Sequence, residues 1–257
     1  MDNSYKEHPL IKTVIFDLGG TLIEYAGPYQ TWPELETPGF QAAYSSLNQN
    51  ANGTILPDFG QLRDAGFALL PRMWQAAIRH EENLQVTNLL RQSLRQIGVE
   101  DISDAQLAEA AAAYGRAIQA QAELIEHAVQ TVAQIKAAGY KVGLVSNTMF
   151  PGQMHREDMA RFGLLPYFEA MVFSADANKW KPNPDPFWQI LADLDADPET
   201  AVYIGDDPAS DIAGGQSAGM HTIYFQSSQR FSKLDDLKPH AEIASLLELL
   251  PLLEQWG

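Results

Sequence analysis

The chain has 257 residues, a hydrophobic content of 46% and a formal net charge of −16 at pH 7. The length allows one large domain or a core with an insertion. The acidic balance argues against nucleic acid and anionic membranes as partners, because both attract basic surfaces. The chain contains no cysteine, which excludes a disulfide scaffold and a thiolate site.

Targeting signals are not evident in the sequence. No apolar stretch is long enough to span a bilayer, and the first seven residues lack the apolar region of a signal peptide. We therefore expect a soluble, cytoplasmic protein that does not bind membranes. The sequence leaves open whether it is a monomer or a homodimer.

The first predicted element is a buried strand over residues 13–16, which is apolar and β-branched and ends at Asp17. Residues 25–126 then show helical periodicity with few strand signals. Within them, residues 27–58 are rich in Pro, Gly and Asn and predict irregular structure, and residues 84–94 predict a helix. The pair Ser103 and Gln106 has the capping-box pattern that begins a further helix.

Strand-like and helix-like segments alternate in the second half of the chain. Helices are predicted over residues 128–138, from about Asn183 as N-cap with Pro184 in the first turn, between residues 207 and 219, and at residues 246–250. Strands are predicted over residues 141–145, 168–173, 201–204 and 221–225. This alternation predicts a parallel sheet with right-handed crossovers.

The predicted architecture is an α/β fold with two parts. Residues 1–24 and 127–257 form a Rossmann-like core with a parallel sheet, and residues 25–126 form an inserted α-helical cap. An insertion directly after the first strand lies above the carboxyl end of that strand, where open α/β sheets bind their ligands. Such a cap can cover a site and exclude water.

Polar clusters recur at the ends of these predicted elements. They are Asp17 with Gly19, Gly20 and Thr21; Ser146 with Asn147; Lys181 with Pro182; and Gly205, Asp206 and Asp207 with Asp211. Taken singly, each has an ordinary interpretation as a turn, a cap or a solvated loop. Parallel strands, however, place their carboxyl ends along one edge of the sheet, so we expect these side chains to converge.

The converging residue types indicate phosphoryl transfer. Carboxylates without His or Cys suit Mg²⁺, which prefers oxygen ligands, and Lys181 adds a second positive charge. Ser146, Asn147 and the N–H groups of the glycine turn can donate hydrogen bonds to phosphoryl oxygens. The carboxylate of Asp17, held in line with phosphorus, can act as a nucleophile and form an aspartyl-phosphate.

These ordered clusters resemble motifs one to four of the haloacid dehalogenase-like (HAD) hydrolase superfamily, and the helical insertion resembles its C1-type cap. The resemblance implies Asp17 as nucleophile and metal ligand, and Ser146 and Lys181 as the other catalytic residues. It implies metal binding by the Gly19 carbonyl and by Asp206, with Asp211 as a supporting carboxylate or second acidic site residue. Gly20, Thr21 and Asn147 are the expected substrate-binding residues, and Asp207 is close enough to share the acidic role.

The sequence departs from the family pattern at Gly19. Family phosphatases usually carry at that position a second Asp, which protonates the leaving group. General acid–base help is worth about 10²–10⁴-fold, so its loss penalises poor leaving groups most. Three explanations stay open: the enzyme hydrolyses phosphates with good leaving groups, such as anomeric or aryl phosphates; another group such as Glu24 or His80 supplies the proton; or the chain is a weak or inactive binder.

The sequence favours a Mg²⁺-dependent phosphatase acting on a small phosphorylated metabolite. Two alternatives stay open: a haloacid dehalogenase, and a catalytically weak module that binds metal and phosphate and acts through protein partners. The cap residues Trp32, Arg72, Trp74 and Arg79 are candidates for the pocket wall. Each also fits the interior or the surface of the cap, so none is assigned.

Overall fold

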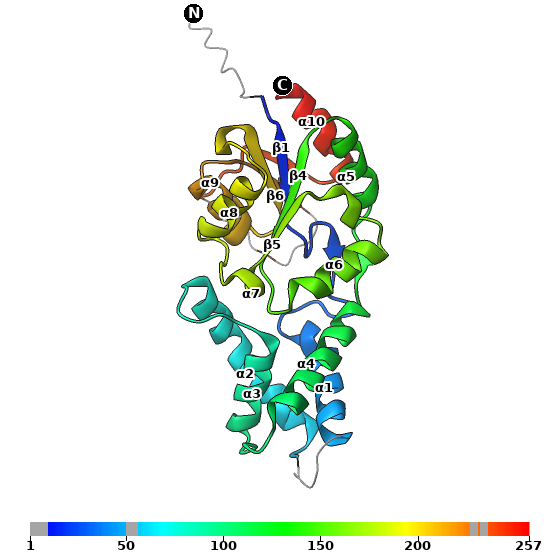
Figure 1. Cartoon of the computed structure of the whole chain (residues 1–257), viewed down its shortest axis with the longest axis vertical. Coiled ribbons are helices and arrows are strands. Elements are labelled where there is room, and N and C mark those ends of the chain that lie inside the picture. The colour runs from blue at the N-terminus through cyan, green and yellow to red at the C-terminus, as the bar shows by residue number, and fades with distance from the viewer. Residues whose placement is uncertain (1–9, 50–55, 227–230, 232–235, 257) are drawn as a thin grey trace, which may run out of the picture.

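The computed structural model describes residues 10–49, 56–226, 231 and 236–256. Its main feature is a parallel sheet, of which β1, β4, β5 and β6 are labelled in Figure 1. The sheet has six strands in the order β5-β4-β1-β6-β7-β8. The strands are β1 (Thr13–Phe16), β4 (Lys141–Ser146), β5 (Ala170–Phe173), β6 (Ala201–Gly205), β7 (His221–Phe225) and β8 (Ala241–Ile243). The predicted parallel α/β sheet is thereby confirmed, with β1 at its centre.

Helices cover both faces of this sheet. Val14 and Phe16 of β1 belong to the apolar cluster that includes α5 (Ala128–Ala137) and α10 (Leu249–Gln255), whereas Ile15 belongs to the cluster formed with α8 (Asp185–Asp193). Successive side chains of a strand point to opposite faces, and both faces of β1 are buried. Burial on both sides explains why β1 is a continuous apolar run.

A group of helices lies at one end of the molecule, beyond the core (Figure 1). They are α1 (Thr37–Gln49), α2 (Phe59–Ile78), α3 (Val86–Gln96) and α4 (Asp104–Gln119). They share an apolar cluster that also includes Met149, Phe150 and Trp180. Strands β2 (Ile23–Glu24) and β3 (Glu123–Leu124) form a separate antiparallel pair where the chain enters and leaves these helices. The boundaries of the cap at residues 25 and 126 stay a prediction.

The prediction of irregular structure over residues 27–58 was wrong for α1. Phe40, Ala43 and Leu47 are buried at helical spacing, but Pro38 and Gly39 masked this signal. Proline is tolerated in the first turn of a helix. Gly39 permits close packing of α1 against α4, since a Cβ there would lie 2.2 Å from the ring of Tyr114. Residues 50–55 of the same stretch lie outside the described residues.

The other differences are local. The predicted helix over 207–219 is a π-helical turn, Pro208–Ile212, followed by α9 (Ala213–Ser217). Helix α8 has Pro184 as N-cap, not Asn183, and the Asn183 side chain instead donates to the main-chain oxygen of Ile78 at 2.6 Å. Three further elements were not predicted from the sequence: β8, α6 (Gly152–Arg161) and α7 (Ser174–Ala177).

Two predicted end signals are confirmed. The Ser103 side chain accepts from the backbone N–H of Gln106 in a capping box that begins α4, and α5 ends just before Gly139, whose φ is 94°. Within the described part of the chain, no helix has both the length and the apolar character needed to cross a membrane. The residues from which the lack of a signal peptide was inferred lie outside the described part.

Candidate active site

The carboxyl edge of the sheet brings the predicted polar clusters into one pocket. Asp17 follows β1, Ser146 is the last residue of β4, and Asp206 follows β6. These strands are neighbours in the sheet, and Phe16 pairs with Leu144 and Ile204 in register. A pocket of about 790 Å³ is lined from the core side by Asp17, Gly19, Ser146, Asn147, Lys181, Asp206, Asp207, Ala209, Ser210 and Asp211.

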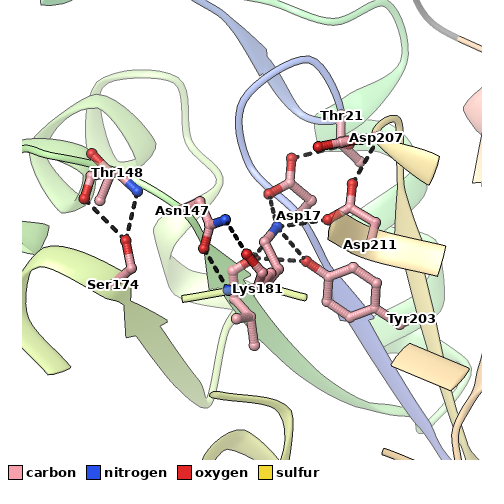
Figure 2. Close-up of polar contacts among 10 residues, drawn as sticks. Asp17, Thr21, Asn147, Thr148, Ser174, Lys181, Tyr203, Asp207 and Asp211 are labelled. Carbon is pink, nitrogen blue, oxygen red and sulfur yellow. Dashed lines mark hydrogen bonds and ion pairs between the residues drawn. The ribbon is translucent and has the colours of Figure 1, made fainter. Parts of the chain in front are cut away.

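Lys181 is the centre of the polar contacts in this pocket. Its Nζ atom donates to Oδ1 of Asp17 at 2.6 Å, to Oδ1 of Asp211 at 2.7 Å and to the hydroxyl oxygen of Tyr203 at 2.9 Å (Figure 2). Burial alone would lower the pKa of the Lys181 ammonium, but the charges of Asp17 and Asp211 outweigh it and raise the pKa well above the usual value. Lys181 is therefore a permanent cation that fixes the position of the Asp17 carboxylate.

Tyr203 was not predicted as a site residue. It lies within β6, where the sequence shows only a buried apolar strand. Its hydroxyl accepts from Lys181 and donates to the main-chain oxygen of Val145 at 2.8 Å. Burial raises the pKa of this phenol well above its usual value, so the group stays neutral. Tyr203 thus helps to hold the ammonium in place, a role that no sequence motif predicted.

The Asn147 side chain, expected to bind substrate, uses both of its polar atoms on the main chain of Lys181. Its amide Nδ2 donates to the main-chain oxygen of Lys181 at 2.9 Å, and its Oδ1 accepts from the main-chain N–H of Lys181, also at 2.9 Å (Figure 2). The two bonds tie the end of β4 to the loop that carries Lys181. This pairing favours a positioning role over direct binding of a phosphoryl oxygen. Ser146 is buried in the pocket wall, and its contact with a phosphoryl group stays a prediction.

The glycine turn after Asp17 is shaped by its own contacts. The N–H of Gly20, whose φ is 85°, donates to the oxygen of Ile23 at 2.8 Å. The Thr21 hydroxyl lies 3.4 Å from Oδ2 of Asp17. Both residues therefore support the turn and the nucleophile candidate, whereas substrate contact by either stays a prediction. Gly19 faces the pocket, and a Cβ added to it would meet no atom within 4 Å.

Three carboxylates in the pocket form a candidate metal site. Oxygen atoms of Asp17, Asp206 and Asp211 lie within 4.8 Å of one another, and all three residues are buried. With Lys181 they carry a net charge of −2 when all are ionised, which a divalent cation would balance. Because the donors are all oxygen atoms, the set fits a hard cation such as Mg²⁺.

Asp211 has the character of a supporting carboxylate. Its Oδ1 accepts from Lys181, and its Oδ2 accepts from the main-chain N–H of Asp207 at 2.9 Å. Burial raises the pKa of Asp211 to about 7, although the charge of Lys181 acts in the opposite direction. The Asp207 side chain accepts from the N–H of Ala209 at 3.0 Å and so begins the π-helical turn. Of these two residues, Asp211 is the one bonded to the central ammonium.

Glu24 and His80, the two candidates to supply the proton in place of an Asp at position 19, lie outside the described pocket wall. Oε1 of Glu24 accepts from the main-chain N–H groups of Tyr25 and Ala26 at 2.7 and 3.0 Å. His80 is exposed just after the end of α2, with a φ of 58°. Neither belongs to the described residues that line the pocket. Neither Glu24 nor His80 is therefore placed to replace the missing Asp.

The cap side of the pocket wall includes two of the four residues that the sequence singled out. The described wall residues outside the core are Gln30, Thr31, Trp32, Leu35, Trp74, Gln75 and Ile78, with Phe231 from the second half of the chain. Arg72 is exposed, and Arg79 is exposed and pairs with Glu81 at 2.7 Å. The aromatic candidates thus line the pocket, whereas the two arginines belong to the surface.

Comparison with known proteins agrees with this geometry. Residues 11–219 match the family described as haloacid dehalogenase-like hydrolase. The chain belongs to this family. The solved 2-haloacid dehalogenase of Pseudomonas syringae pv. Tomato DC3000 shares the HAD fold with a TM-score of 0.70 and 26% sequence identity, covering 96% of this chain and 100% of that protein.

Curated relatives of the HAD chain include phosphatases. The pyrophosphatase PpaX of Bacillus cereus (strain B4264) is 34% identical over 132 residues, which are 51% of this chain and 60% of the relative. The glyceraldehyde 3-phosphate phosphatase of Methanopyrus kandleri is 31% identical over 165 residues, which are 63% of this chain and 70% of the relative. The match thus spans about 60% of the length of the pyrophosphatase and somewhat more of the second enzyme.

Proposed function

We propose that the chain is a Mg²⁺-dependent phosphomonoesterase that acts on a small phosphorylated metabolite. The observation that carries this proposal is the placement of Asp17: its carboxylate is held 2.6 Å from a buried ammonium, at the sheet edge, beside two further buried carboxylates. The names of the curated relatives, a pyrophosphatase and a phosphatase, support phosphoryl chemistry. Membership of a hydrolase family supports an enzyme rather than a passive binding module.

The proposed reaction has two displacement steps. An oxygen of Asp17 attacks phosphorus, the bond from phosphorus to the ester oxygen breaks, and the leaving group departs with the electron pair. Water then attacks the phosphorus of the aspartyl-phosphate, which releases inorganic phosphate and restores the carboxylate. Without an acid at Gly19, the departing oxygen takes its proton from water.

The described residues divide the remaining work. Lys181 orients Asp17, and its positive charge attracts the phosphoryl oxygens. Ser146 donates its hydroxyl to the same oxygens. Asp17, Asp206 and the Gly19 carbonyl would hold Mg²⁺, with Asp211 in support. When bound, the metal would offset the charge of the carboxylates and of the phosphoryl group. These contributions are positioning and electrostatic stabilisation, which phosphoryl transfer mainly requires.

The test is turnover of a panel of phosphate esters with Mg²⁺ and with EDTA. We expect phosphate release that requires Mg²⁺ and that falls at least 1,000-fold, by analogy with removal of other catalytic groups, in Asp17→Asn. The matched control is Asp193→Asn, because Asp193 is exposed at the end of α8. Absence of phosphate release from every ester, by a folded protein that still binds Mg²⁺, would favour the binding module.

A second candidate activity follows from the structural likeness to a 2-haloacid dehalogenase. That activity would use the Asp17 carboxylate on carbon and would release halide. The cluster of three buried carboxylates argues against it, because two additional negative charges repel a carboxylate substrate. Chloride release from 2-chloropropionate in the presence of EDTA would instead establish the dehalogenase.

A further inference from the structure

The cap side of the active-site pocket has an aromatic wall, formed by Trp32 and Trp74. Their ring centroids lie 5.7 Å apart in an edge-to-face arrangement, and Trp74 packs in the same way on Trp180 with centroids 5.1 Å apart. Trp180 is completely buried, and its Nε1–H donates to Oδ1 of Asn83 at 3.1 Å. The wall is therefore anchored at the residue that directly precedes Lys181.

Trp32 is the outer member of this row and is still 40% exposed. The exposed part of the Trp32 indole is apolar surface at the pocket that a bound ligand can cover. An aromatic ligand group would pack edge-to-face or offset on such rings, with centroid spacings like those within the row. The exposed ring thus fits a planar aromatic group on the cap side of the pocket.

The wall also lacks charge. Among the described residues that line the pocket, Lys181 is the single cation, and its ammonium is bonded to Asp17 and Asp211. The described cap-side residues offer only amide and hydroxyl groups besides their apolar surface. A second anionic group on the substrate would therefore meet four pocket carboxylates without a free counterion. The described wall therefore suits a substrate that carries no charge besides its phosphate group.

The missing acid at Gly19 restricts the leaving group independently. An alkoxide must depart from an alcohol whose pKa is near that of water, about 15.7, whereas a phenolate departs from a phenol with a pKa of about 10. The phenolate needs far less proton transfer at the moment of bond cleavage. The lack of an acid at position 19 and the aromatic cap wall thus both favour an aryl oxide as the leaving group.

We propose that the substrates are aromatic phosphomonoesters in which the phosphate is attached directly to a neutral aryl ring. This inference rests on the phosphatase activity proposed above and names its substrate class. Asp17 attacks phosphorus, the bond between phosphorus and the aryl oxygen breaks, and the aryl oxide keeps the electron pair and is protonated by water. The ring of the leaving group lies against Trp32 and Trp74 while this happens.

The first test compares four phosphates in the presence of Mg²⁺: phenyl phosphate, cyclohexyl phosphate, 4-carboxyphenyl phosphate and acetyl phosphate. We expect kcat/KM for phenyl phosphate to exceed that for cyclohexyl phosphate at least 100-fold, as expected for catalysis without a general acid. The added carboxylate of 4-carboxyphenyl phosphate should raise KM. Equal kcat/KM values for the phenyl and cyclohexyl esters, or for the phenyl and carboxyphenyl esters, would overturn the proposal.

The second test isolates the aromatic wall. Trp32→Leu and Trp74→Leu should lower kcat/KM for phenyl phosphate about 2- to 12-fold, the range expected for one aromatic contact, and leave acetyl phosphate unaffected because it has a good leaving group but no ring. The control is Trp188→Leu, since Trp188 is 52% exposed on α8 and lies outside the described pocket wall. Equal losses on both substrates, or in all three variants, would refute ring recognition.

The two proposals can fail separately. If no phosphate, including acetyl phosphate, is hydrolysed by the folded protein with Mg²⁺, the phosphatase proposal itself is wrong. If acetyl phosphate is hydrolysed but phenyl phosphate has no advantage over cyclohexyl phosphate, only the aryl specificity is wrong. Far-UV circular dichroism of each tryptophan variant excludes unfolding as the cause of a loss.

Discussion

The Nζ atom of Lys181 lies 2.6 Å from Oδ1 of Asp17, and the two residues are 164 positions apart in the chain. Both side chains are almost completely buried. A buried ion pair of this kind is held by the surrounding fold, because its desolvation cost is large and only well-placed partners offset it. The proposed nucleophile, Asp17, is one member of this buried pair.

Replacing Lys181 by Met should destabilise the metal-free protein by about 3–5 kcal/mol, because it leaves Asp17 and Asp211 buried without their cation. Urea denaturation in EDTA measures this loss in the free energy of unfolding. The matched control is Lys136→Met, whose partner Glu169 lies 2.7 Å away at the surface; exposed pairs contribute at most about 1 kcal/mol. Similar losses in the two variants would contradict a special role for the buried pair.

Replacing Tyr203 by Phe should mainly impair positioning of Lys181. The change removes the hydroxyl that accepts from Lys181 and donates to Val145. We expect a loss of about 1–3 kcal/mol in the free energy of unfolding, since buried polar groups lose a partner, together with a lower kcat and little change in KM. Tyr167→Phe, at a half-buried position of the core, is the control. A rise in KM at constant kcat would indicate substrate contact instead.

Replacing Gly19 by Asp should restore proton transfer to the leaving group. The pocket has room for the side chain, because a Cβ at Gly19 would meet nothing within 4 Å. We expect kcat for cyclohexyl phosphate to rise at least tenfold, toward the range of about 10²–10⁴ for general acid catalysis. Gly19→Asn has the same shape without the acid and serves as control. A gain with Asn equal to that with Asp would show that proton transfer is not the cause.

Asp206 is expected to bind Mg²⁺ in the absence of substrate. Mg²⁺ at 100 times its dissociation constant should stabilise the wild-type protein by about 2.7 kcal/mol, and Asp206→Asn should remove most of this effect. Thermal unfolding across a Mg²⁺ titration measures it, with Asp193→Asn as an exposed control. Undiminished stabilisation of Asp206→Asn by Mg²⁺ would exclude Asp206 as a ligand.

Glu36 should make the stability of the cap pH-dependent. Burial raises the pKa of Glu36 to about 7. The Tyr114 hydroxyl donates to this carboxyl at 2.9 Å and lowers its pKa, but by less than burial raises it. Since the pKa in the unfolded chain is near 4.5, this carboxyl contributes fully to stability below pH 4.5, and its contribution is lost as the pH rises through 7. The loss is on the order of 3 kcal/mol.

Glu36→Gln tests this sign. The variant keeps an oxygen that can accept from Tyr114 but cannot ionise. We expect it to be more stable than the wild-type protein at pH 8 and similar to it at pH 5, as measured by chemical denaturation at both pH values. The exposed Glu82 provides the control variant Glu82→Gln. An advantage of Glu36→Gln that is equal at the two pH values would contradict ionisation as the cause.

The sequence by itself determined five strands of the sheet, all but β8, and predicted that the polar residues after them converge at one edge. The apolar runs before Asp17, Ser146 and Asp206 are short and strongly patterned, and parallel strands end at a common edge, so their convergence followed from local signals. The helix at Thr37–Gln49 was missed because Pro38 and Gly39 are local breaking signals, and its stability comes from packing on α4.

Only the tertiary structure decided how the site residues use their polar atoms. The amide of Asn147 pairs with the main chain of Lys181, Tyr203 reaches the Lys181 ammonium from within a strand, and Trp32 and Trp74 form one wall. Each of these contacts joins segments far apart in the chain, and side-chain direction across such distances depends on packing rather than on local pattern. Sequence periodicity fixes which face a residue occupies, whereas the packed fold fixes what it touches there.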